Sequence, residues 1–259
     1  MRVSAPQDSG NIVVIDTENA QDIHLKIRPD NQARAYQWFY FEVEGVENES
    51  FVINIDNAGG ASYPGWHDFG VMYRATASTD REHWSRLDTT YHQDSGLLTI
   101  QGQLVTDRMA IAFFPPYSYA RHLKLIEKAR TIPNCTVSSL GQSVEGRDLT
   151  LLTVGSPGAN KKNIWVIARQ HPGETMAEWY VEGLIDRLAQ GDDLSEFFAD
   201  AVLYIVPNMN PDGSYHGNLR TNALGQDLNR QWDVSDNKAK APEVLRAKSN
   251  LARRDCSDV

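Results

Sequence analysis

His171 and Glu174 have the residue types and the spacing of two metal ligands. They belong to a His-Pro-Gly-Glu sequence that follows a predicted buried strand at residues 163–168 and precedes a predicted helix at residues 175–189. A loop beyond a strand end is where open α/β sheets bind ligands. Imidazole and carboxylate are ordinary zinc ligands, and a catalytic zinc takes three protein ligands plus a water. His171 and Glu174 could therefore supply two of these three ligands.

The same pair has a plainer interpretation. A histidine and a glutamate three residues apart often occur by chance. A glutamate in the first turn of a helix also complements the positive end of the helix dipole. The spacing of His171 and Glu174 alone leaves both interpretations open.

Two arginines and an asparagine follow the next predicted strand, at residues 201–206. That strand leads into residues 207–213 (PNMNPDG), which are expected to form a surface loop because Pro, Asn, Asp and Gly favour turns. Arg220, Asn229 and Arg230 then stand in predicted loop positions. Arginine can hold a planar carboxylate by two parallel hydrogen bonds or stabilise an oxyanion during acyl transfer. The alternative is that both arginines are simply solvated.

The elements that must position these residues fall into two parts. From about residue 10 to 115, short runs rich in β-branched and aromatic residues alternate with turn residues, which is typical of an antiparallel β-sandwich. The strands are expected at residues 12–15, 24–27, 37–43, 51–55, 71–75, 97–100 and 109–113.

After residue 116 the hydrophobic period changes. Residues 117–129 place apolar and aromatic residues at helical spacing, and residues 149–154 form a further apolar run. Buried strands that alternate with helices predict an α/β sheet. The expected fold class is α+β overall, with a β-sandwich domain at residues 1–116 and an α/β domain at residues 117–259.

Composition excludes several classes of protein. The chain of 259 residues is 41% hydrophobic and 23% charged, as in an ordinary globular protein. Its net charge of −9, without a basic run, argues against a nucleic-acid binder. No apolar stretch is typical of a signal peptide or long enough to cross a bilayer, so a cytoplasmic location and no membrane partner are expected. Cys135 and Cys256 indicate neither a disulfide framework nor a cysteine metal site.

Taken together, the motifs resemble those of the zinc carboxypeptidase family, in order and spacing, across roughly residues 120–235. His-Pro-Gly-Glu at 171–174 matches the family's first two zinc ligands, and Asn-Pro-Asp-Gly at 210–213 matches its characteristic turn. Asp-Leu-Asn-Arg at 227–230 contains its carboxylate-binding Asn-Arg pair. The aromatic runs at residues 38–41 and 113–119 are similar to the β-sandwich domain that precedes the catalytic domain in cytosolic carboxypeptidases.

The resemblance implies a mixed sheet in the second domain and a zinc-dependent hydrolase, a metallopeptidase that removes residues from the C termini or glutamate side-chain tails of peptides and proteins. Carried over by position, His171 and Glu174 would hold Zn²⁺. Arg220 would face the carbonyl oxygen of the scissile bond. Asn229 and Arg230 would hold the C-terminal carboxylate of the substrate.

The resemblance also implies groups that these residues do not supply. The family's third zinc ligand is a later histidine, followed by a substrate-capping tyrosine and a catalytic glutamate, but no histidine follows His216. His216 precedes Arg220 and is not expected to replace the missing ligand. We therefore expect a truncated catalytic domain that is inactive by itself. The alternatives are a noncatalytic module that binds carboxylates or peptides, and a nonfunctional fragment of a disrupted reading frame.

Overall fold

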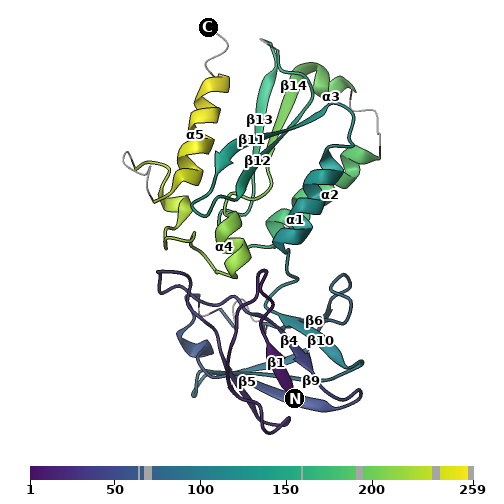
Figure 1. The fold of residues 1–259 in the computed structure, drawn as a ribbon, viewed down its shortest axis with the longest axis vertical. Helices are drawn as coiled ribbons and strands as arrows, with labels where there is room; N and C mark the ends of the chain where they lie inside the picture. The colour runs from purple at the N-terminus through teal and green to yellow at the C-terminus, as the bar shows by residue number, and fades with distance from the viewer. Residues whose placement is uncertain (64, 67–71, 159, 191–194, 235–239, 256–259) are drawn as a thin grey trace. The chain divides into compact units, whose positions relative to one another are not determined.

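The computed structural model describes residues 1–63, 65–66, 72–158, 160–190, 195–234 and 240–255, which form two compact units (Figure 1). Unit 1 comprises Met1–Asp30, Arg34–Pro116 and Tyr215–Leu219. Unit 2 comprises Asn31–Ala33, Tyr117–Ser214 and Arg220–Val259.

Unit 1 contains two five-stranded sheets in its described residues, with strand orders β1-β4-β10-β6-β7 and β2-β3-β5-β9-β8. The described strand pairs are antiparallel except for β3 and β5, which run parallel. The strands are β1 (Arg2–Ser4), β2 (Val13–Asp16), β3 (Ile23–Lys26), β4 (Tyr40–Glu44), β5 (Ser50–Ile55), β6 (Thr76–Ser78), β7 (Ser85–Arg86), β8 (Asp88–His92), β9 (Leu97–Gln103) and β10 (Arg108–Ala112), with a 3₁₀ turn η1 (Ala58–Gly60).

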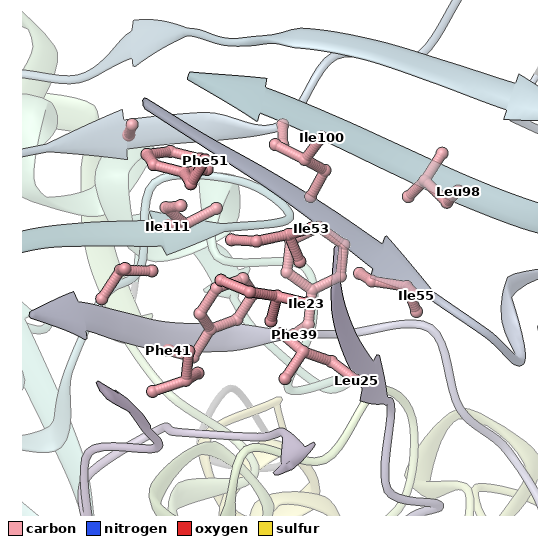
Figure 2. Packing of buried hydrophobic residues seen from close by; sticks show 14 of the residues in the cluster. Ile23, Leu25, Phe39, Phe41, Phe51, Ile53, Ile55, Leu98, Ile100 and Ile111 are labelled. Carbon is pink, nitrogen blue, oxygen red and sulfur yellow. The ribbon is translucent and has the colours of Figure 1, made fainter. Parts of the chain in front are cut away.

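The two sheets of unit 1 share one hydrophobic core. Ile53 and Ile55 of β5 and Phe41 of β4 are each 0% exposed and belong to the same buried cluster. Figure 2 shows these side chains, from strands of both sheets, packed together. Alternate residues of a strand point to opposite faces, so each sheet turns one apolar face inward. The predicted β-sandwich is confirmed, and the parallel pair makes one of its sheets mixed.

Unit 2 is built on a four-stranded sheet of order β11-β12-β14-β13 in the described part of the chain. Strand β12 is antiparallel to β11 and to β14, whereas β13 runs parallel to β14, so the sheet is mixed as predicted. The strands are β11 (Cys135–Gln142), β12 (Asp148–Val154), β13 (Lys162–Ile167) and β14 (Ala201–Val206). The helices are α1 (Tyr119–Ala129), α2 (Met176–Ala189), α3 (Ser195–Asp200), α4 (Pro211–His216) and α5 (Pro242–Asp255), with a 3₁₀ turn η3 (Leu228–Arg230).

Helices cover both faces of this sheet. Leu203 and Ile205 of β14 belong to the buried cluster that contains α1 and α2, whereas Val202 and Tyr204 belong to the cluster that contains α5. Figure 1 shows α1 and α2 on one side of the sheet and α5 on the other. Because both faces are covered, β14 is apolar along its whole length, as the sequence predicts for a buried strand.

Two expectations about local structure were wrong. Residues 72–75 lie outside any strand, and β6 begins at Thr76; residue 71 lies outside the described residues. The predicted surface loop at 207–213 instead includes the start of helix α4, and Asn208, Asn210 and Asp212 are at most 1% exposed. Their side chains have hydrogen-bond partners inside the protein: Asn210 Oδ1 accepts from the Gly213 amide at 3.0 Å, and Asp212 Oδ1 accepts from Ser143 Oγ at 2.7 Å.

Candidate metal and substrate site

Two parallel strands bring the candidate residues to one edge of the unit 2 sheet. The carboxyl ends of β13 and β14 meet there, and the Ala168 amide extends the ladder to the Val206 carbonyl at 2.9 Å. The Met209 amide then returns to the Ala168 carbonyl at 3.0 Å. The segment that leads to His171 therefore lies beside the segment that leads to α4.

The His171 turn places an imidazole against a carboxylate. The Glu174 amide donates to the His171 carbonyl at 3.1 Å, which closes the turn immediately before α2. His171 is buried and Glu174 is exposed. His171 Nδ1 lies 2.9 Å from Glu174 Oε1. The turn thus brings the side chains of the two predicted ligands next to each other.

Asp227 occupies the other side of the imidazole and was not among the predicted site residues. Its Oδ1 lies 3.0 Å from His171 Nε2, and its Oδ2 accepts a hydrogen bond from Arg220 Nε at 2.7 Å. The Asn229 amide also donates to Oδ1 at 3.0 Å. A metal-ligating histidine commonly donates its second N–H to such a carboxylate, which leaves the other nitrogen free for the metal. The signal in the sequence was the aspartate that opens Asp-Leu-Asn-Arg.

These contacts shift the pKa values of both partners. The Glu174 carboxylate raises the pKa of His171 above its ordinary value; burial opposes this shift, and Asp227 adds to it. Burial acts to raise the pKa of Asp227, but the hydrogen bonds from His171 and Arg220 outweigh it and leave this pKa below its ordinary value. Asp227 is therefore ionised at neutral pH and available as an acceptor.

The donor set fits a zinc ion at the two positions that the chain supplies. In a tetrahedral zinc centre with bonds of about 2.0–2.1 Å, two ligand atoms lie about 3.3 Å apart. His171 Nδ1 and Glu174 Oε1, at 2.9 Å, would need to separate by only about 0.4 Å. The Glu174 side chain is 56% exposed, which leaves it room to adjust.

A third ligand is not present among the described residues. No group of three or more His, Cys, Asp or Glu side chains in that part of the chain is arranged to hold a metal ion. Asp227 does not complete the set, because it contacts the opposite ring nitrogen from the one that faces Glu174. The arrangement provides two candidate ligands and a carboxylate that contacts one of them.

The predicted substrate-binding residues lie at different distances from this pair. Arg220 is bonded to Asp227 and so is brought next to His171. Asn229 and Arg230 lie in η3, and both are exposed. Arg230 Nη1 donates to the Asn229 carbonyl at 3.1 Å. Asn229 contacts Asp227 through its main-chain amide.

Gly213 explains why Asn-Pro-Asp-Gly ends in glycine. A Cβ atom at this position would lie 2.5 Å from the Thr221 carbonyl oxygen and 2.6 Å from Pro172 Cγ. Real Cβ atoms do not approach backbone oxygen this closely, so α4 can pack against the His171 turn and the Arg220 segment only without a side chain there.

Comparison with known proteins identifies the chain. A model of the cytosolic carboxypeptidase N-terminal domain matches residues 3–114, and a zinc carboxypeptidase model matches residues 123–251. The chain is 43% identical to a metallo-carboxypeptidase from Pseudomonas aeruginosa, solved in complex with (2-guanidinoethylmercapto)succinic acid, with a TM-score of 0.90 over 98% of this chain and 67% of that one. The protein belongs to the zinc carboxypeptidase family, with the N-terminal domain of the cytosolic carboxypeptidases.

Relatives of known sequence extend further than this chain. It is 39% identical to a Zymomonas mobilis protein over 97% of its own length and 64% of that protein's. It is 32% identical to human cytosolic carboxypeptidase 6 over 87% of its own length and 48% of that protein's. The chain thus spans about half to two thirds of these relatives.

In its described part, no helix has the length and apolar character needed to span a bilayer.

Proposed function

We propose that this chain supplies the first two zinc ligands and the substrate-binding groups of a metallocarboxypeptidase that hydrolyses the C-terminal peptide bond of peptides and proteins. The observation that supports this most directly is the position of His171, with Nδ1 at Glu174 and Nε2 at Asp227. Bound zinc would supply a Lewis acid for the scissile carbonyl and a water of lowered pKa.

The chain's own residues would orient the ligand and receive the substrate. Asp227 would accept a hydrogen bond from the Nε2–H of His171 and so favour the tautomer in which Nδ1 offers its lone pair to the metal. Arg220 Nε donates a hydrogen bond to Asp227 Oδ2, which places the guanidinium next to His171. In the proposed role its terminal nitrogens stabilise the negative charge that develops on the carbonyl oxygen.

Asn229 and Arg230 would bind the substrate carboxylate. Both side chains are exposed, and the planar guanidinium of Arg230 can bind a carboxylate through two parallel hydrogen bonds. The Pseudomonas aeruginosa relative was solved with a guanidino derivative of succinic acid, a compound that carries carboxylates. That complex is consistent with recognition, by this chain, of a carboxylate at the C terminus or on a glutamate side chain of the substrate.

A noncatalytic binding module is the second candidate. It is favoured by the two-ligand set, because among the described residues nothing completes a metal site. In this function Arg220, Asn229 and Arg230 would recognise a carboxylate without turnover. For either candidate we expect the 259-residue chain alone to release no amino acid, since a catalytic zinc needs three protein ligands.

Zinc binding and peptide hydrolysis, measured together, test the proposal. Competition with a chromophoric chelator should show weak Zn²⁺ binding by the 259-residue chain and its loss in His171→Ala, while the matched His216→Ala retains it. Zinc affinity that is equal in His171→Ala and the parent chain would refute the site. We expect no release of C-terminal residues from a peptide mixture by the 259-residue chain. Chelator-sensitive release that is absent in His171→Ala would contradict this expectation, establish catalysis and exclude the binding-module alternative.

A further inference from the structure

Four buried polar side chains form one hydrogen-bonded cluster beneath the His171 turn. Arg169, Glu178, His122 and Asn208 are each at most 2% exposed. The Arg169 guanidinium pairs with Glu178 Oε2, which also accepts from Asn208 Nδ2 at 3.0 Å. Glu178 Oε1 lies 2.7 Å from His122 Nδ1. The cluster, named here the Arg169 cluster, joins α1, α2 and the segments that follow β13 and β14.

Stability alone does not account for these charges. Removing two charges from water costs several kcal/mol per ion, and a buried ion pair can often be replaced by apolar residues of similar volume without loss. Glu178 instead has partners on both oxygens, and Arg169 has partners on Nε and Nη1. Such a satisfied network fixes the relative positions of the segments that it joins.

Arg169 reaches directly into the proposed metal-binding turn. Its Nε donates to the Pro172 carbonyl at 3.0 Å, and its Nη1 donates to the Tyr117 carbonyl at 2.6 Å. Pro172 lies between the two proposed ligands, so the guanidinium fixes the backbone that connects them. Arg169 itself has a φ of 51°, a left-handed conformation that non-glycine residues rarely adopt. Its side-chain contacts hold the chain in this conformation at the point where it leaves β13.

Glu178 holds the other end of the same turn. It lies in the first turn of α2, four residues after Glu174, and is 0% exposed. The pair with Arg169 holds the first turn of α2 against the segment that follows β13. It therefore also fixes the backbone position of Glu174, which immediately precedes this helix. One buried ion pair therefore connects the backbone on both sides of the His171–Glu174 contact.

We propose that Arg169 and Glu178 are positioning residues that hold His171 and Glu174 at ligand spacing before the metal binds. The inference rests on the proposed function of His171 and Glu174 as zinc ligands. A preformed pair does not have to be ordered by the metal, so its affinity is higher. Preorganisation of the ligands contributes most to affinity where few ligands hold the ion.

Arg169→Lys separates positioning from charge compensation. A lysine ammonium can still pair with Glu178, but it cannot reproduce the planar fork that also reaches Pro172 and Tyr117. We expect Zn²⁺ affinity of the 259-residue chain to fall about tenfold, the lower end of what loss of an orienting group costs. The measurement is chelator competition with Zn²⁺ alone, corrected for the folded fraction from thermal unfolding of the zinc-free protein.

Arg121→Lys is the matched control. Arg121 also joins α1 to α2, through bonds of 2.8 and 2.7 Å to the two oxygens of Glu182, so both variants alter an arginine that pairs with a glutamate of α2. The Pro172 carbonyl accepts from Arg169, whereas these Arg121 bonds go to Glu182. We expect Arg121→Lys to lower thermal stability and to leave zinc affinity within about twofold of the parent.

The outcomes distinguish the two proposals. If His171→Ala abolishes zinc binding and Arg169→Lys leaves the affinity unchanged, the positioning role is refuted and the site stands. If His171→Ala changes nothing, the site is refuted and the positioning role with it. If Arg169→Lys fails to fold, His122→Gln is the second test. This variant alters the hydrogen bond to Glu178 Oε1 and should weaken zinc affinity at least about threefold. An unchanged affinity refutes the inference.

Discussion

At the scale of single residues, Asp227 decides what His171 can do. A neutral imidazole has one N–H, and an ionised carboxylate at Nε2 draws that proton to its own side of the ring. With zinc in place of a proton between His171 and Glu174, the lone pair at Nδ1 would face the ion that Glu174 also binds. The same carboxylate accepts a hydrogen bond from Arg220, so one aspartate orients a proposed ligand and a proposed substrate-binding group.

Asp227→Asn tests this double role. An amide offers one acceptor oxygen, so it cannot accept from both His171 and Arg220, and its NH₂ group would face one of the two donors. We expect zinc affinity about 10–100-fold below that of the parent chain, with the fold retained. Chelator competition and circular dichroism measure the two quantities. The control is Asp186→Asn on α2, whose exposed carboxylate pairs with Lys128; an equal loss in both variants would contradict the role of Asp227.

The sequence singled out the candidate residues of the site more readily than the residues that contact them. His171, Glu174 and Arg220 stood out because their chemistry and spacing are local properties. Asp227 did not, because its value depends on a contact with a histidine 56 residues earlier. Arg169 did not stand out either. Its positive φ is unusual for a residue other than glycine, and neither this φ nor its contact with the Pro172 carbonyl can be predicted from the sequence.

At the scale of elements, apolar periodicity predicted where strands and helices lie. Turn-forming residues were a poorer guide, because hydrogen bonds of their side chains led some of them to be buried. Helix α1 was expected at 117–129 and begins at Tyr119, because Ser118 caps it by accepting from the Arg121 amide at 3.1 Å. Residues 207–213 looked like a surface loop, yet Asp212 is buried where it accepts from Ser143 at 2.7 Å and Arg147 at 2.8 Å. Partners distant in sequence made these polar residues structural.

A histidine on β3 makes the stability of unit 1 depend on pH. His24 Nδ1 lies 2.8 Å from Asp56, and its Nε2 lies 3.1 Å from Asp22. The hydrogen bond with Asp56 raises the pKa of His24; slight burial opposes the shift, and the charges of Asp56 and Asp22 add to it. Because the folded-state pKa exceeds the unfolded one, the stabilisation is complete below about pH 6.5 and is lost as pH rises through the raised pKa.

His24→Gln should therefore cost stability only at low pH. We expect urea unfolding to show a deficit of up to about 1 kcal/mol near pH 5.5 and none near pH 9, a small value because the pair is partly exposed. Asp56→Asn removes the largest cause of the shift and should flatten the same profile. A deficit in His24→Gln that is constant across this range would contradict the assignment.

At the scale of the whole molecule, the hydrophobic cores follow the two compact units. Each buried cluster of the described residues draws its members from one unit: two lie in unit 1 and two in unit 2. Matches to two family models, at residues 3–114 and 123–251, fall on either side of the predicted boundary at residue 116. Domains at 1–116 and 117–259 stay a proposal, because compactness does not establish that each part folds independently.

Paired core substitutions test that proposal. Ile53 on β5 and Ile205 on β14 are both 0% exposed, one in each unit, and truncation of such a residue to alanine costs about 2–5 kcal/mol. His171, Glu174 and Asp227 all belong to unit 2. We therefore expect Ile53→Ala to lower stability without changing the zinc affinity of the folded protein.

Ile205→Ala should lower both quantities. Ile205 pairs in register with Val166, five residues before His171, so a cavity there disturbs the strand that carries the proposed ligand. Urea unfolding and chelator competition on the two variants give the comparison, and effects of cavities more than about 7–10 Å from a site are usually independent of it. Equal losses of zinc affinity in Ile53→Ala and Ile205→Ala would show that the two parts of the chain act as one cooperative domain.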